Sequence, residues 1–128
     1  MIRLRTAILA AMGICAAATP ALAQLGMGLV AAKRVTGPES DTITATGDTQ
    51  YREIMLCVDD APIQVQDITL RYRNGSAQTL RVRSRILAGR CGRVLTLTGR
   101  ERIIATADLT YQPLPADGPR PNVQIYGR

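Results

Sequence analysis

Arginine side chains recur at alternate positions on both sides of an Asn-Gly pair, and this spacing is where the sequence offers chemistry. The stretch 67–86 reads DITLRYRNGSAQTLRVRSRI, and its arginines are Arg71, Arg73, Arg81, Arg83 and Arg85. A guanidinium group binds carboxylate or phosphate through two parallel hydrogen bonds. The row therefore predicts either an anion-binding surface or the solvated outer face of an antiparallel sheet, where charge also blocks edge-to-edge aggregation.

The residue types that most enzymes use at neutral pH are missing. The chain contains no histidine, which excludes Ser-His-Asp and Cys-His catalysis and the usual zinc sites. No glycine-rich phosphate-binding loop follows a strand pattern, so no nucleotide cofactor is indicated. We therefore expect a non-enzymatic protein with no catalytic residue, no metal and no cofactor.

Carboxylate pairs are the remaining enzymatic option. Asp59 and Asp60 are adjacent, and Glu39 and Asp41 follow a Gly-Pro pair. A glycosidase needs two carboxylates about 5–10 Å apart across a cleft. Neighbouring aspartates at a chain reversal more often shape the turn, and the spacing at Asp59 and Asp60 is not that of an EF-hand calcium loop. We interpret both pairs as turn residues.

Aromatic residues that could stack on sugars or bases are scarce. The chain has no Trp and no Phe, and two of its four tyrosines, Tyr72 and Tyr111, fall on the predicted core side of their strands. Neutral glycans and nucleic acids are therefore disfavoured as ligands. The expected partner is an anionic glycan, lipopolysaccharide or an acidic protein. The alternative is a structural or assembly protein that interacts through edge strands, with the arginines only a solvated face.

The first 23 residues predict a signal peptide. A basic start, MIRLR, precedes the apolar stretch TAILAAMGICAAATP, and Ala21-Leu22-Ala23 gives the small-x-small cleavage pattern. The apolar stretch is shorter than the ~20 residues of a membrane span. Uncleaved anchoring is the alternative, which the helix-breaking Pro20 disfavours. We expect a periplasmic or secreted domain, residues 24–128, without stable membrane insertion; its formal charge falls from +6 to +4 with the loss of Arg3 and Arg5.

Two cysteines, Cys57 and Cys91, remain after the predicted signal peptide is removed. An even number of cysteines in an exported chain predicts one disulfide, and two separate buried thiols are the alternative.

Period-two alternation of apolar and polar residues recurs along the mature chain, broken at short intervals by Gly, Pro, Asn and Asp. It predicts strands at 27–35, 42–46, 51–58, 63–73, 79–87, 92–98, 102–111 and 122–127. Eight short strands, with no repeat and no long linker, indicate a single all-β domain. The predicted fold is an antiparallel β-sandwich of jelly-roll type, with a small partly open β-barrel as the alternative.

The same alternation predicts the core: Ile54, Leu56, Val58, Ile68, Leu70, Tyr72, Leu80, Val82, Ile86, Leu95, Leu97, Ile103, Ala105, Ala107, Leu109, Tyr111, Val123 and Ile125. The phase changes between Val65 and Ile68, which predicts a bulge near Gln66-Asp67. A plain two-residue turn at Asn74-Gly75 would bury charged arginines, which is prohibitively costly. The hairpin therefore needs an odd-length loop or a bulge near 77, and either places the five arginines on one outer face.

The hairpin also resembles a known family. The segments that carry the likeness are Asp41-Thr42-Ile43, ITLRYRNG at 68–75, LRVR at 80–83, Gly89, Leu97, Gly99, Arg102 and Ile104. They are similar to a family of small exported Gram-negative proteins of unknown function, over roughly residues 25–111. The resemblance implies an exported β-sandwich and no activity, and the two cysteines are not part of its pattern.

Overall fold

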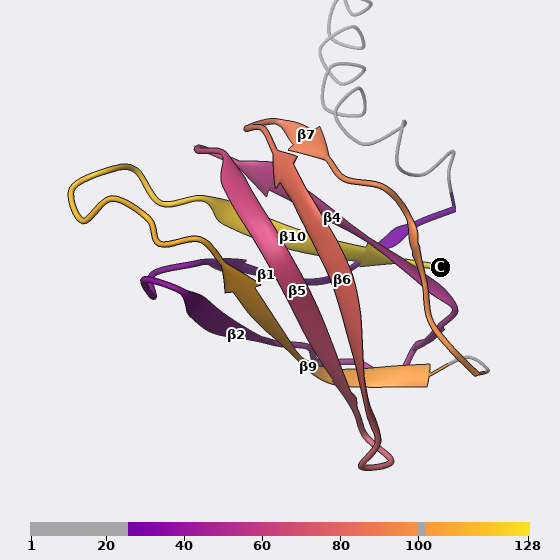
Figure 1. Cartoon of the computed structure of the whole chain (residues 1–128). Helices are drawn as coiled ribbons and strands as arrows, with labels where there is room; N and C mark the ends of the chain where they lie inside the picture. Colours follow the sequence, from indigo (N-terminus) through magenta and orange to yellow (C-terminus); the bar gives the residue numbers. More distant parts are fainter. Residues whose placement is uncertain (1–25, 100–101) are drawn as a thin grey trace, which may run out of the picture.

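The computed structural model describes residues 26–99 and 102–128, and these form two antiparallel sheets packed face to face (Figure 1). The strands are β1 (Gly28–Arg34), β2 (Ser40–Thr44), β3 (Gln50–Tyr51), β4 (Glu53–Asp59), β5 (Ile63–Tyr72), β6 (Ala77–Ile86), β7 (Arg90–Cys91), β8 (Leu95–Thr96), β9 (Arg102–Tyr111) and β10 (Asn122–Gly127). The first sheet has the order β1-β10-β4-β7, with β8 also paired to β4. The second has the order β2-β9-β5-β6, with β3 also paired to β9.

The predicted all-β sandwich is confirmed, because the two sheets stay separate over the described residues and do not close into the alternative barrel. The predicted signal peptide lies outside the described residues. Within the part of the chain that the structure describes, no helix is long and apolar enough to span a membrane.

Two predicted strands are divided in the structure. The segment 51–58 separates at Arg52 into β3 and β4, which belong to different sheets. The segment 92–98 forms only the two-residue β8, and a further short strand, β7, lies before it. The chain changes sheets between β3 and β4, whereas β7 and β8 both pair with β4. Period-two alternation within a short window carries no signal for either kind of break.

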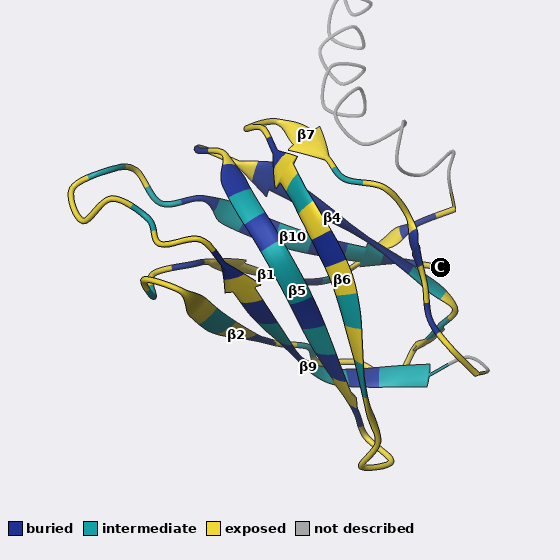
Figure 2. Cartoon of the chain, in the orientation of Figure 1, coloured by how far each residue is buried: buried dark blue, intermediate teal, exposed yellow. Residues whose placement is uncertain are grey.

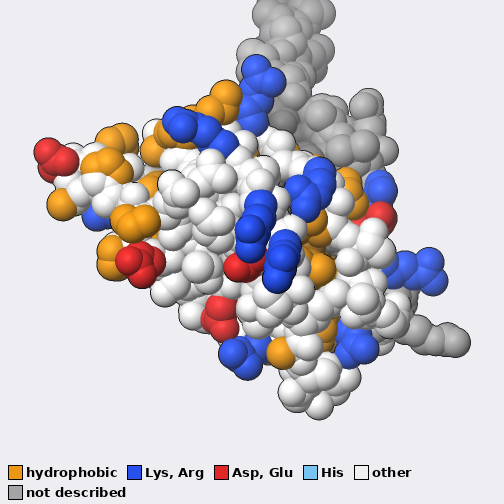
Figure 3. All heavy atoms as spheres, viewed as in Figure 1, with side chains coloured by type: hydrophobic (Ala, Val, Ile, Leu, Met, Phe, Trp, Pro, Cys, Tyr) orange, Lys and Arg blue, Asp and Glu red, His pale blue; other side chains and the backbone are white. Residues whose placement is uncertain are grey.

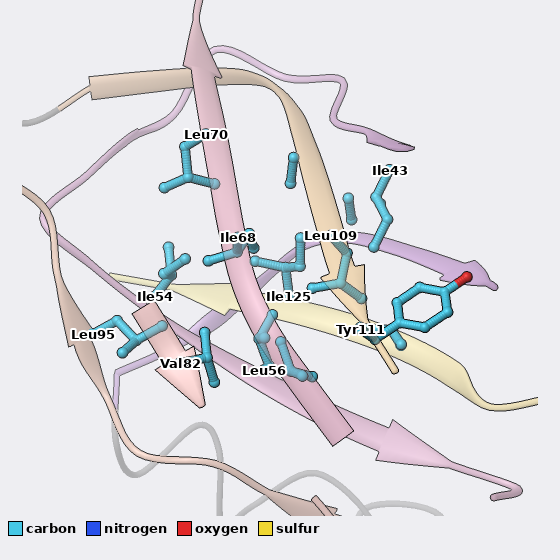
Figure 4. Packing of buried hydrophobic residues seen from close by; sticks show 14 of the residues in the cluster. Ile43, Ile54, Leu56, Ile68, Leu70, Val82, Leu95, Leu109, Tyr111 and Ile125 are labelled. Carbon is cyan, nitrogen blue, oxygen red and sulfur yellow. The ribbon is translucent and has the colours of Figure 1, made fainter. Parts of the chain in front are cut away.

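The core fills the space between the sheets (Figure 4). Its fully buried side chains include Ile43, Ile54, Leu56, Ile68, Leu70, Leu109, Tyr111 and Ile125. The prediction is wrong for Ile103 and Ala105, because Ile104 is the buried residue of that segment. The β5–β9 register shifts where Tyr72 pairs with Ile104, so the alternation in β9 changes phase by one residue there.

The β5–β6 hairpin has the odd-length loop, which is one of the two arrangements that the arginine pattern predicts. Tyr72 N donates to Ser76 O at 2.9 Å, and Gly75 N donates to Tyr72 O at 3.0 Å, which leaves three loop residues. Gly75 has φ +92°, a left-handed conformation that glycine adopts without steric cost. Even-numbered residues of β5 consequently face even-numbered residues of β6 near the turn, as in the pair of Ile68 with Leu80.

Further from the turn, the second sheet widens through two successive bulges, and the one at Gln66-Asp67 is the predicted one. Gln64 and Asp67 of β5 lie opposite Arg85 and Arg81 of β6, so three residue steps on β5 face four on β6. On the other side of β5, Gln112 N donates to Gln64 O, and Thr110 pairs with Asp67, so only two steps face the same three. Over this stretch β5 therefore has one residue more than β9, and β6 has one residue more than β5.

A disulfide joins Cys57 and Cys91, as the sequence predicts. The two residues are direct register partners on β4 and β7. The bond therefore fixes the short strand β7 against the first sheet, and with it the chain that leaves β6.

Candidate anion-binding site

The five predicted arginines divide into two groups in the structure. Arg71 Nε donates to Asp108 Oδ2 of β9 at 3.1 Å, and Arg73 at the hairpin tip forms an ion pair with Asp48. These two charges are neutralised by carboxylates of the same molecule. They are therefore poorly placed to hold an external anion.

The other three, Arg81, Arg83 and Arg85, are exposed on β6 and have no ion-pair partner among the described residues. We name them the β6 arginine row. Asp67, the residue directly opposite Arg81, makes no ion pair with it, and its Oδ1 is buried without a hydrogen-bond partner. In Figure 3, cationic side chains gather over the β5–β6 pair in the middle of the view.

The β6 bulge lies in the middle of this row. Val82 and Arg83 together face the single residue Gln66, and Arg83 has φ +42°. A non-glycine residue in this left-handed region costs of order 1 kcal/mol. Figure 2 shows the exposed residues alternating with more buried ones along β6 on either side of the bulge. The bulge lets Arg81 and Arg85 keep the outer face while Val82 and Ile86 stay in the core.

A shallow hollow of about 300 Å³ opens beside the end of the row. Its polar lining comes from Arg85, Gln64 and Gln112, which lie on adjacent strands or directly after them. Its apolar wall comes from the start of β5 and from the proline-rich connection that follows β9: Pro62, Ile63, Pro113, Leu114 and Pro115. The hollow thus places one guanidinium and two amides next to aliphatic surface.

Two further arginines near the hairpin have structural partners. Arg93 donates to the backbone carbonyls of Arg81 at 2.9 Å and Val82 at 3.0 Å, so it covers the outer edge of β6. Arg102 lies over the ring of Tyr72, 4.9 Å from its centroid. Burial raises the pKa of Tyr72 despite the nearby Arg102 charge, so the hydroxyl stays protonated and bonds Gln78. Arg100, a possible neighbour by sequence, lies outside the described residues.

Asp59 and Asp60, the adjacent carboxylates, each have a partner of their own in the structure. Asp59 accepts a hydrogen bond from Gln124 at 2.8 Å, and Asp60 forms an ion pair with Arg34 at 2.7 Å. Asp60 has φ +74°, which is the turn conformation that Asp tolerates. In the described ranges, no group of three or more His, Cys, Asp or Glu side chains could hold a metal ion.

Sequence reasoning missed the hollow and the division of the arginines. Gln64, Gln112 and Leu114 come from segments about 50 positions apart, and their sequence neighbours show no binding motif. The sequence signal that could have pointed to them is the predicted bulge, because bulges are frequent beside functional sites.

Comparison with known proteins places the chain in a family. Residues 7–127 match the domain of unknown function DUF2541. The chain belongs to this family. The match confirms the expected membership of a family of unknown function and extends beyond residues 25–111, over which the sequence resembles such a family.

Among solved structures, the DUF2541 chain is similar to AlgX of Pseudomonas aeruginosa, with a TM-score of 0.52 and 14% sequence identity. The likeness covers 79% of this chain and 26% of AlgX, so the chain spans about a quarter of that protein. At this identity the likeness supports the fold alone. No curated protein matches the chain.

Proposed function

We propose that this DUF2541 protein is an exported, non-enzymatic binding protein that holds an anionic component of the cell envelope through the β6 arginine row. The observation that carries the proposal is the division of the arginines. Arg71 and Arg73 are neutralised by Asp108 and Asp48, whereas the three arginines of β6 have no carboxylate partner in the described part of the chain.

Charge physics favours a ligand at this row. Like charges in one row repel one another, and Asp67, the carboxylate opposite Arg81, forms no ion pair with it. Three guanidinium groups without an ion pair on one strand create a local positive potential and present fork-shaped donors that match carboxylate and phosphate. The Arg83 bulge adds a second reason, because backbone strain persists where the surrounding structure maintains it and clusters at functional sites.

Export is supported by the disulfide between Cys57 and Cys91 together with the predicted signal peptide. Stable disulfides are typical of oxidising compartments and rare in the cytosol. The anions within reach of a protein in that setting include lipopolysaccharide phosphates, acidic polysaccharides and acidic proteins.

The alternative, assembly through edge strands, finds less support at β6. A strand edge binds another strand through free backbone groups. Arg93 already occupies two β6 carbonyls, and Thr98 N donates to the Gln78 side chain further along the same edge.

The test is retention of the protein on immobilised lipopolysaccharide and on neutral dextran across a salt series. The site variant replaces Arg81, Arg83 and Arg85 by Ser. The matched control replaces three carboxylate-paired arginines by Ser, Arg34, Arg73 and Arg128, and so removes the same charge.

We expect salt-sensitive retention of the wild type and the control, because exposed charges are screened within about 10 Å at 0.1 M salt. The site variant should lose at least tenfold in retention, because the three guanidinium groups that contact the anion are missing. Equal loss in both triple variants would show that only net charge matters and would contradict a site at the row. Hydrolysis of a glycan or peptide by the wild type, lost in Asp60→Asn, would contradict the non-enzymatic assignment.

A further inference from the structure

The outer face of the β2-β9-β5-β6 sheet is a continuous hydrogen-bonding surface around the β6 arginine row. Its register places polar residues side by side across the four strands. One cross-strand row is Thr42, Asp108, Thr69 and Thr79, and the next is Ser40, Thr110, Asp67 and Arg81. Beyond the bulges, a third row is formed by Gln112, Gln64 and Arg85, at the hollow.

The groups in these rows suit a hydroxyl-rich ligand. Hydroxyls and amides both donate and accept hydrogen bonds, as sugar hydroxyls do. Part of this capacity is used within the face, since Thr42 donates to Asp108 at 2.8 Å and Thr69 bonds Thr79 at 2.9 Å. Gln64 and Gln112 have no side-chain hydrogen bond among the described residues, and Gln64 is the direct register partner of Arg85.

We infer that the anionic ligand is an acidic polysaccharide, with one uronic acid residue in the hollow and the chain continuing along the arginine row. This inference rests on the proposed function and names its ligand class. Arg85 would bind the sugar carboxylate, the two glutamine amides would bond ring hydroxyls, and the aliphatic wall at Leu114 would cover the apolar face of the ring. A repeating chain supplies further carboxylates to Arg83 and Arg81.

The size of the hollow agrees with a single sugar residue. A volume of about 300 Å³ is at the lower end of the range for ligand pockets. Because the hollow is shallow and continuous with the sheet face, it can hold one unit of a longer chain without enclosing the chain's ends.

Other anionic partners fit the face less well. A lipid surface is held by inserted apolar side chains as well as charge, and the exposed large apolar residues of the described chain are only Leu29, Leu87 and Val94. A protein interface is anchored by buried aromatic residues, and this face presents none among the residues of its rows. Single-stranded nucleic acid requires stacking platforms, which are equally missing from these rows.

The test compares three immobilised probes: polygalacturonate, which carries carboxylates; a dextran sulfate chosen to match it in charge per sugar residue; and neutral dextran. To test the ligand class, Gln64 and Gln112 are both replaced by Ala, which changes the lining of the hollow but not the net charge of the protein. Its control is Gln50→Ala, since Gln50 is an exposed residue that does not line the hollow. Binding is compared only among variants whose melting temperature equals that of the wild type. Leu114→Ser provides a second change to the hollow.

We expect the wild type to bind polygalacturonate at least tenfold more tightly than dextran sulfate. The Gln64→Ala/Gln112→Ala variant should lose most of this preference, as should Leu114→Ser, while both keep their binding to dextran sulfate. Equal binding of both polyanions, lost in the Arg81/Arg83/Arg85 variant and unchanged in the hollow variants, would overturn the polysaccharide inference and leave the anion site standing. Failure of both polyanions to bind above neutral dextran would overturn the inference and the anion site together.

Discussion

Replacing Asp41 by Asn should destabilise the fold in a pH-dependent way, because this carboxylate holds the turn between β1 and β2. Its Oδ1 accepts from Lys33 Nζ at 2.5 Å and from Thr42 N at 2.9 Å, and its Oδ2 accepts from Thr36 N at 2.9 Å. The side chain is only 11% exposed, so water cannot replace these partners fully. Tyr111 closes the same turn by donating to Gly37 O at 2.7 Å.

The expected cost follows from these contacts. A hydrogen bond to a charged group contributes about 1.5–3 kcal/mol, and contributions within one cluster do not add fully. Asn retains one acceptor oxygen but loses the charge and the second acceptor. We therefore expect Asp41→Asn to lower the free energy of unfolding by about 2 kcal/mol at pH 7, which corresponds to a melting temperature roughly 8–16 °C lower.

The pH dependence has a defined sign. Burial alone would raise the pKa of Asp41, but the Lys33 ammonium and the backbone N–H groups of Thr36, Thr42 and Gly37 outweigh it and hold the pKa below its ordinary value of 3.8. The stabilisation by the carboxylate is therefore fully present above about pH 4 and is lost as the pH falls through the folded-state pKa. The difference between wild type and Asp41→Asn should narrow over that acidic range.

The assay is urea unfolding of both proteins between pH 7 and pH 2.5, with Asp48→Asn as the control. Asp48 also forms an ion pair, with Arg73, but its side chain is 84% exposed, so its replacement should cost no more than about 0.5 kcal/mol. A loss for Asp41→Asn that is as small as the control's, or that stays constant with falling pH, would refute the assignment of a charge-dependent role to this turn.

Three further perturbations test the fold around the site. Replacing Cys57 and Cys91 by Ser should lower the free energy of unfolding by roughly 3–4 kcal/mol, since a bond that spans 34 positions constrains the unfolded chain; reductant should then leave the variant's urea midpoint unchanged. Leu109→Ala should cost about 2–5 kcal/mol, whereas Leu29→Ala, at a 57% exposed position, should stay within about 0.5 kcal/mol in the same assay. Arg93→Ala should cost about 1 kcal/mol and, by freeing two β6 carbonyls, should increase self-association in sedimentation velocity runs.

The hairpin could be predicted from the sequence because charge and parity constrain it together. Burying Arg81 or Arg83 is so costly that only an odd-length loop or a bulge near 77 is compatible with the core residues on both strands. The structure has that loop, and the bulge at Gln66-Asp67 lies where the alternation of apolar residues changes phase.

The phase of β9 could not be predicted in the same way. Ile103, Ile104 and Ala105 are all apolar, so either phase of the alternation satisfies the sequence locally. The choice is made by the pairing of Tyr72 with Ile104 across the sheet, a contact between residues 32 positions apart. Where neighbouring residues are equally apolar, register and not composition decides which one is buried.

The site was only half predictable for a related reason. Alternation places an arginine on the outer face, but whether a carboxylate neutralises it depends on the residues of the neighbouring strand. Arg71 is neutralised because β9 brings Asp108 next to it, whereas Arg85 lies opposite Gln64. No local pattern distinguishes these two arginines, so the division of the row appears only once the strand order is known.

The two bulges link the fold to the proposed site. Because the chain adds one residue per strand from β9 through β5 to β6, the core residues Tyr111, Val65 and Ile86 stay inside while the outer residues move apart toward the β6 edge. If β6 lacked its bulge, the register near the turn would continue and pair Arg85 with Ile63 in phase, which would turn Arg85 toward the core. The bulge on β6 includes Arg83, which is held in a left-handed conformation because the core register requires an extra residue there. The same feature therefore keeps the core closed and sets the spacing of the arginines in the row that we propose as the anion site.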